Sequence, residues 1–196
     1  MLLDTLMTSW MAAAAAKGIT PGSSYEGIAM ADDMVLAVRD PSKQASASGD
    51  DIGKYVVVEG YTKSVTASLN PETKESAYIR AGKSTTKTGN QRTIAYEQDR
   101  YHGDEFQDFA DSKKYATGED AVVDYVYISR LTLRGEKGKA TLAMDTDGSG
   151  NAEENLAISG SLSKTGAAPD IGAVSYTAPV SPATVGTLAW TSDSTA

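Results

Sequence analysis

The sequence predicts a mainly β protein, a sandwich or barrel with one flanking α-helix and an arm at each terminus. Apolar and polar residues alternate along several segments, as where Val65, Ala67 and Leu69 are separated by threonine and serine. Turn-forming residues, glycine above all, punctuate these segments at short intervals. The chain has two Phe but ten Tyr, so its core must rely on Tyr, Val, Ile, Leu and Ala. This composition favours strands over helices.

Residues 1–30 are expected to form an Ala-rich N-terminal arm that begins with a helix. Four large apolar side chains are spaced to share one helical face: Leu2, Leu3, Leu6 and Trp10. The segment lacks the basic start of a signal peptide, since Asp4 is the only charge before Lys17, and it is too short to span a bilayer. We therefore expect a helix here, with a secretion signal as the alternative.

Residues 31–170 are expected to form the β-domain, and residues 171–196 a Ser/Thr/Pro-rich C-terminal arm, flexible or packed. The strands are predicted at 34–38, 55–59, 61–69, 76–81, 92–97, 121–133, 139–144 and 155–162. Turns are predicted at 70–71, 81–83, 88–90, 135–138 and 145–150, and a polar loop at 41–53.

One helix is predicted inside the body, at about residues 104–115. Asp104 is suited to cap its N-terminus, with Gln107 at the third helical position. Phe106 and Phe109 lie on one face by their spacing, and lysines follow at the C-terminal end. Because both phenylalanines of the protein lie here, we expect this helix to plug an open end or face of the sheet.

Net charge limits the classes of partner. The chain carries a formal charge of -8 with a pI near 4.7, which excludes a general nucleic-acid binder and docking on anionic membranes. Residues 97–125 hold nine acidic and three basic side chains, whereas residues 61–96 hold six basic and two acidic ones. Adjacent segments of opposite sign suit self-association, although solvated faces of a soluble monomer have the same pattern.

One stretch has part of the pattern of a calcium loop. Asp145, Asp147 and Ser149 stand at its first, third and fifth positions, but Leu156 occupies the position of the bidentate glutamate. A polar turn between two strands accounts for the same residues. We expect no metal and no cofactor, and keep these three residues as a weak calcium candidate.

The remaining candidate sites are weak too. Residues 49–55 resemble a phosphate-binding loop only faintly, because the spacing is one residue short and two aspartates would repel phosphate. His102 lacks the local signature of a catalytic triad. The carboxylate pairs at 50–51, 119–120 and 153–154 sit in predicted turns, and the absence of cysteine excludes thiolate sites. We therefore expect no enzymatic activity.

Residues 121–133 are apolar on both faces. Val123 and Tyr125 lie on one face of this predicted strand, and Val126 and Ile128 lie on the other. Such a strand is either central in the fold or covered in part by another subunit.

The order of several short segments resembles the major tail (tail tube) proteins of long non-contractile phages and prophages, especially those of Gram-positive hosts. The resemblance covers roughly residues 55–170, and no single segment is diagnostic. The segments are VEGYTKSV at 58–65, SLNPET at 68–73, AYI at 77–79, STTKTG at 84–89, YE at 96–97, GDEFQDF at 103–109, GEDA at 118–121 and ISGSL at 158–162.

The resemblance implies a tail-tube β-sandwich or barrel with one flanking helix, assembled as stacked hexameric rings around a channel for phage DNA. In this family a long hairpin or loop between early strands contacts the next ring, and the segment 69–91 is the candidate here. The assembly residues expected on this basis are Leu69, Asn70, Pro71, Lys74, Tyr78, Arg80, Lys83, Lys87 and Arg92. An acidic lumen would let DNA slide through without specific binding.

The resemblance also implies partners and a location. The partners are further copies of the chain, the tape-measure protein, and the tail terminator and baseplate-hub proteins, without membrane anchoring. The location is the virion tail, with assembly in the host cytoplasm. Two other functions stay open: the inner tube of a contractile tail, bacteriocin or type VI secretion device, and a secreted calcium- or carbohydrate-binding β-domain.

Overall fold

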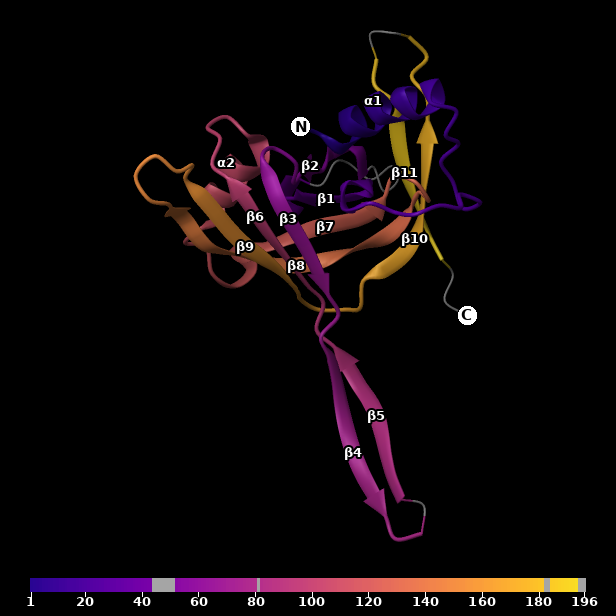
Figure 1. Ribbon diagram of the computed structural model, residues 1–196, viewed down its shortest axis with the longest axis vertical. Helices are drawn as coiled ribbons and strands as arrows, with labels where there is room; N and C mark the ends of the chain where they lie inside the picture. The colour runs from indigo at the N-terminus through magenta and orange to yellow at the C-terminus, as the bar shows by residue number, and fades with distance from the viewer. Residues whose placement is uncertain (44–51, 81, 182–183, 194–196) are drawn as a thin grey trace.

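The computed structural model describes residues 1–43, 52–80, 82–181 and 184–193 (Figure 1). The polar loop predicted at 41–53 lies mostly outside this range. The elements are α1 Leu3–Ala16, β1 Met34–Arg39, β2 Val56–Val57, β3 Thr62–Ser68, β4 Pro71–Tyr78, β5 Gly82–Asn90, β6 Thr93–Asp99, α2 Glu105–Lys113, β7 Val122–Ser129, β8 Arg134–Ser149, β9 Ala157–Lys164, β10 Asp170–Thr177 and β11 Thr187–Ser192.

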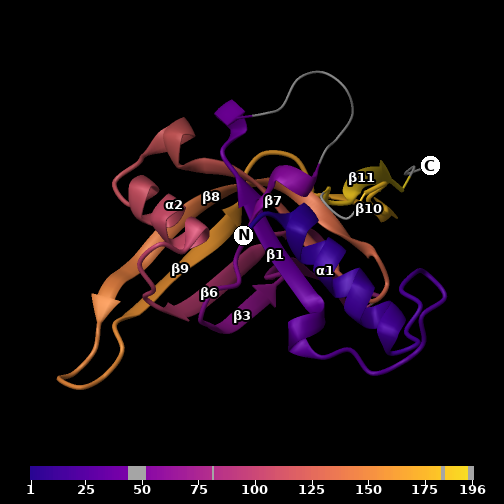
Figure 2. The same ribbon diagram turned by 90° about the horizontal axis from the view of Figure 1, so that it is seen from above.

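The predicted mainly β fold is confirmed. Nine strands form one curled sheet, in the order β2-β1-β7-β8-β9-β6-β3, with β10 paired to β8 and β11 paired to β10. Its pairings are antiparallel, and β4 and β5 form a separate two-stranded sheet. Seen from above (Figure 2), the two helices lie over different parts of the sheet, and β10 and β11 stand to one side.

Two apolar cores cover the two faces of the sheet. Val35 and Ala37 of β1 belong to the core beneath α1, while Leu36 and Val38 of the same strand belong to the core beneath α2. β7 is divided in the same way. Both faces of β7, which lies within the predicted strand 121–133, are therefore covered by the chain itself. Its two apolar faces are thus explained by a central position in the fold, without a covering subunit.

The predicted N-terminal helix is present as α1, and it belongs to the core. Leu3 and Met7 are fully buried, and Leu6 and Trp10 pack against the same core. The backbone N–H of Leu3 donates to the carbonyl of Tyr55 at 2.9 Å, which fixes the start of the helix beside β2. The 3.6-residue spacing of the apolar side chains is the reason that this face packs inward.

The C-terminal segment is not a flexible arm throughout, because β10 and β11 fall within or next to it. Leu188 and Trp190 of β11 are buried with Val174 of β10, while the Ser and Thr residues between them face outward. The indole N–H of Trp190 donates to the Asp170 carboxylate at 3.0 Å. Serine and threonine content suggested an arm, but here these residues occupy the exposed face of a hairpin.

Three predicted turns are wholly or mainly strand instead, at 88–90, 135–138 and 145–150, and residues 145–149 of the last belong to β8. Residues 135–138 lie inside β8, and the chain reverses earlier, between β7 and β8, where Leu133 has φ +53°. A Cβ on Gly135 would stand 2.2 Å from the carbonyl oxygen of Tyr127, so glycine is needed there for close approach of the strands. Residues 88–90 likewise belong to β5, where Gly89 lies opposite Glu72 at a bulge.

Candidate assembly surface

The β4–β5 hairpin projects from the body as a long, narrow arm (Figure 1). Its strands pair from Pro71 opposite Asn90 to Tyr78 opposite Gly82. Nearly all its described residues are exposed, with only Ser76 and Gly89 partly covered. The local sequence explains this, because both faces carry Thr, Ser, Lys and Glu and neither offers a continuous apolar surface to a core.

Side-chain hydrogen bonds fix the base of the hairpin. Asn70 adopts φ +41°, a left-handed conformation that asparagine tolerates better than most residues. Its side-chain amide donates to the carbonyl of Gln91 at 3.1 Å and to the hydroxyl of Thr93 at 3.3 Å. Gln91 in turn donates to the carbonyl of Lys164 at 3.0 Å. The hairpin is therefore anchored to β6 and β9 where it leaves the body.

The structure brings most of the predicted assembly residues onto this arm or its base. Leu69 is exposed at the base, before Asn70, and the others on the arm are Pro71, Lys74, Tyr78, Arg80, Lys83 and Lys87. The sequence prediction omits Ile79, which is fully exposed at the tip. The sequence signal that could have identified Ile79 is that it is an apolar residue in a polar strand, next to a predicted turn.

Arg92 stands apart from the other predicted assembly residues. Its side chain is 11% exposed, and its Nε lies 2.6 Å from Oε1 of Glu136 on β8. The guanidinium also lies over the ring of Tyr127, 5.5 Å from its centroid. Reversing the charge of Arg92 would therefore break contacts inside the body, and it should be left out of any test of the hairpin.

Helix α2 packs against one face of the sheet. The Asp104 side chain accepts from the backbone N–H of Gln107 at 2.9 Å, which confirms the predicted N-cap. Phe106 is fully buried and meets the ring of Tyr96 edge-on, with 5.0 Å between the ring centroids. Phe109 packs against the same core but is only partly buried. Of the two phenylalanines predicted to plug the sheet, Phe106 is therefore the more deeply buried.

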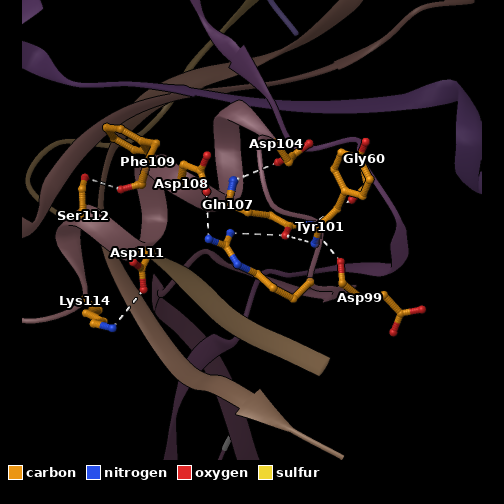
Figure 3. Close-up of polar contacts among 11 residues, drawn as sticks. Gly60, Asp99, Tyr101, Asp104, Gln107, Asp108, Phe109, Asp111, Ser112 and Lys114 are labelled. Atoms are coloured by element: carbon orange, nitrogen blue, oxygen red, sulfur yellow. Dashed lines mark hydrogen bonds and ion pairs between the residues drawn. The ribbon is translucent and has the colours of Figure 1, made fainter. Parts of the chain in front are cut away.

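The carboxamide of Gln107 ties three segments together (Figure 3). It does not return to the N-cap residue, as a capping box would require. Its Nε2 donates to the carbonyls of Asp99 at 2.9 Å and Gly60 at 3.2 Å, and its Oε1 accepts from the backbone N–H of Tyr101 at 2.7 Å. Gln107 is fully buried, so these bonds satisfy a polar group that has no access to water. The network holds the start of α2 against the end of β6 and the turn before β3.

An ion pair fastens the C-terminal end of α2 to the segment after β1. The Lys113 ammonium lies 2.9 Å from the Asp40 carboxylate. This contact, together with hydrogen bonds from Ser42, lowers the pKa of Asp40 to about 2. The folded pKa lies below the ordinary value of 3.8, so the contribution to stability is complete above about pH 4 and is lost as the pH falls towards 2.

Asp40→Asn is expected to lower the free energy of unfolding at pH 7 by about 1 kcal/mol, a figure reduced for solvent screening. Urea unfolding at pH 7 and at pH 2.5 measures the effect, and the gap between variant and wild type should shrink at the lower pH. Asp120→Asn is a matched control, because Lys113 contacts the backbone carbonyl and not the carboxylate of Asp120. An equal loss for both variants, or a gap that widens in acid, contradicts the assignment.

The structure does not gather the remaining candidate residues into a site. Asp145, Asp147 and Ser149 belong to β8 and not to a separate loop, and Asp147 lies 3.5 Å from the Lys114 ammonium. Within the described ranges, no group of three or more His, Asp or Glu side chains is arranged to hold a metal ion. The phosphate-loop resemblance at 49–55 lies partly outside those ranges, and the pair Asp50–Asp51 lies wholly outside them.

The other candidates lie in exposed turns and short helical turns. His102 is exposed in the turn before α2, and Glu119 and Asp120 are exposed in a short 3-10 turn before β7. Glu154 accepts from the backbone and side chain of Asn151 at 3.0 and 2.9 Å, which closes the turn after β8. These bonds lower the pKa of Glu154. In the described part of the chain, no helix is long and apolar enough to cross a membrane.

Comparison with known proteins shows likeness in fold alone. No protein-family model matches the chain, and no curated protein matches it. A chain in the C6-symmetric tail of an empty gene transfer agent particle is 12% identical, with a TM-score of 0.55 over 74% of this chain and 98% of that one. A chain in the virion of the native gene transfer agent is 10% identical, with a TM-score of 0.53 over 84% of this chain and 100% of that one. A third chain, in the 6-fold symmetrised baseplate of the anti-feeding prophage, has a TM-score of 0.43 at 8% identity and is too distant to define a fold.

Proposed function

We propose that this chain is a structural virion protein that polymerises as stacked hexameric rings to form a tail tube through which phage DNA passes. The observation that carries the proposal is the exposed β4–β5 hairpin, which projects from a β body with the fold of a chain in a C6-symmetric tail. A ring of six such bodies, each with an arm along the axis, has the parts needed for both ring closure and stacking.

The hairpin itself supports an assembly role. A two-stranded hairpin with no core of its own is marginally stable in water. This one has an exposed tip where Tyr78 is 60% exposed and Ile79 is uncovered. Contact with another subunit would bury these side chains and provide the packing that the isolated chain does not.

The charge of the chain supports passage of DNA without retention. Its net charge of -8 repels phosphate, so a channel lined by such subunits would not hold the DNA that moves through it. On this proposal the protein is not an enzyme, and its place is in the virion tail. Its further partners are the tape-measure protein inside the tube and the terminator and baseplate-hub proteins at its ends.

Removing the hairpin is expected to abolish polymerisation and leave the body folded. Residues 71–90 are replaced by Asn-Gly, a two-residue turn that suits the close approach of Asn70 and Gln91, whose backbones are bonded at 3.2 Å. Wild-type protein should form hollow filaments by negative-stain microscopy, and the deletion variant should not. Near-unchanged circular dichroism and melting temperature would show that its body is intact.

A monomeric wild-type protein would contradict the proposal. If the wild type stays monomeric at high concentration, and calcium raises its melting temperature, the secreted binding-domain alternative is favoured instead. Hollow filaments of the deletion variant would show that the hairpin is not the stacking element.

A further inference from the structure

A groove lies between β2 and β3, the two strands at the ends of the sheet order. Its volume is about 470 Å³, enough for a few large side chains. One wall comes from β3, which pairs only with β6 in the described part of the chain. The groove therefore lies where the curled sheet stays open. It is lined in part by Met34, Val58, Val65 and Ser64.

Two carboxylates on the groove form no ion pair among the described residues. They are Asp32 and Glu59, both exposed. The adjacent cations are already engaged, Arg130 by Asp33 at 3.3 Å and Lys63 by Asp99 at 2.6 Å. Partial desolvation raises the pKa of Glu59, although the N-terminal ammonium and Arg130 act to lower it. The groove thus combines several apolar side chains with polar ones, among them two carboxylates that form no ion pair.

The tip of the hairpin has the opposite character. Arg80 and Lys83 are its charged residues, and neither forms an ion pair within the described chain, while Glu72 and Glu75 lie nearer the base. Tyr78 and Ile79 add exposed apolar surface next to these cations. Apolar side chains beside unpaired positive charge at the tip match the apolar lining residues beside the carboxylates of the groove.

The positions of tip and groove suit stacking end to end. In Figure 1 the hairpin leaves the body at one end, whereas α1, β2 and the start of β3 lie at the other. The eight residues of β4 extend the tip by about 26 Å at the usual rise per residue of a strand. Such a head-to-tail contact can be repeated from copy to copy, because the copies at the two ends of a stack leave a tip free at one end and a groove free at the other.

We propose that the groove between β2 and β3 receives the tip of the β4–β5 hairpin from a second copy of this chain, with Arg80 and Lys83 facing Asp32 and Glu59. The inference rests on the proposed tube function and adds to it the surface that the hairpin meets. The two partners are the same protein, so the contact repeats along the tube.

Site-directed cross-linking tests the contact directly. The chain has no cysteine, so introduced thiols are the only ones present. Filaments of the Ile79→Cys, Ser64→Cys double variant, treated with a short bismaleimide, should give a ladder of multimers on a denaturing gel. Ile79→Cys combined with Ser112→Cys is the matched control, because Ser112 is exposed on α2, away from the groove lining. The control should give no ladder.

Charge reversal gives a second readout. Arg80→Glu with Lys83→Glu should raise the critical concentration for polymerisation about tenfold or more, and so should Asp32→Lys with Glu59→Lys. All four changes in one chain restore opposite signs and should recover much of the loss. A merely structural role for the groove would not give this recovery.

The outcomes separate the inference from the proposed function. Filaments of the Ile79→Cys, Ser64→Cys variant that give no ladder, or a ladder no stronger than that of the Ser112→Cys control, overturn the groove assignment and leave the tube intact. Tip reversal that blocks filaments while groove reversal does not means that the tip docks elsewhere. A wild-type protein that forms no filaments overturns both.

Discussion

Replacing Phe106 by alanine is expected to lower the free energy of unfolding by about 3–5 kcal/mol, the usual cost of deleting a buried phenyl ring. The ring is fully buried and touches Tyr96 edge-on, so its removal leaves a cavity and loses an aromatic pair. The neighbouring side chains stand on strands of the sheet, which restrict how far they can move to fill the space.

Urea unfolding followed by circular dichroism measures this effect. Tyr115→Ala is the control, because this aromatic side chain is 85% exposed just after α2, and its loss should change stability by less than about 0.5 kcal/mol. Phe109→Ala should lie between the two, since Phe109 is partly buried. A loss for Phe106→Ala no larger than that for Tyr115→Ala would show that the helix does not plug the sheet.

Replacing Gln107 by leucine is expected to cost about 3 kcal/mol, although leucine is similar in size and more apolar. The change leaves the N–H of Tyr101 and the carbonyl of Asp99 without the partner that Gln107 provides, whereas the carbonyl of Gly60 still accepts from Gln98 at 3.2 Å. Each buried unsatisfied group costs about 1–3 kcal/mol. Burial of the more apolar side chain offsets only part of that loss.

Hydrogen exchange distinguishes this cause from a simple packing defect. The amide of Tyr101 should exchange faster in Gln107→Leu than in wild type, beyond the change set by global stability. Ser112→Ala serves as the comparison, since this exposed hydroxyl bonds only the carbonyl of Phe109 one turn back. Unchanged protection of the Tyr101 amide would mean that water or another group replaces the lost carboxamide.

Several elements could be predicted because their signals are local. The period-two pattern around Val65 gives β3, and the spacing of Leu3, Leu6 and Trp10 gives the buried face of α1. Asp104 caps α2 as expected, because a cap needs only the residues of the first helical turn.

Other elements escaped prediction because distant residues decide them. Gly135 has the composition of a turn, but it lies in β8 since Tyr127 and Ile128 of the neighbouring strand approach too closely for a side chain. The Ser and Thr residues of β11 favour an arm by composition, whereas pairing with β10 places them in a hairpin. The network of Gln107 joins Gly60 to Asp99, which are far apart in the sequence.

Some features of the candidate assembly surface can likewise be seen in the sequence, and others only in the fold. From the sequence alone it follows that residues 61–96 are mainly basic, with six basic and two acidic side chains, and that the protein as a whole is acidic and lacks cysteine. The tertiary structure alone decided that this segment stands away from the body, that Arg92 belongs to the body beside Glu136, and that Asp32 and Glu59 meet at one groove. The reason is physical: alternation and capping depend on neighbours along the chain, whereas sheet order and exposed edges depend on pairing between strands remote in sequence.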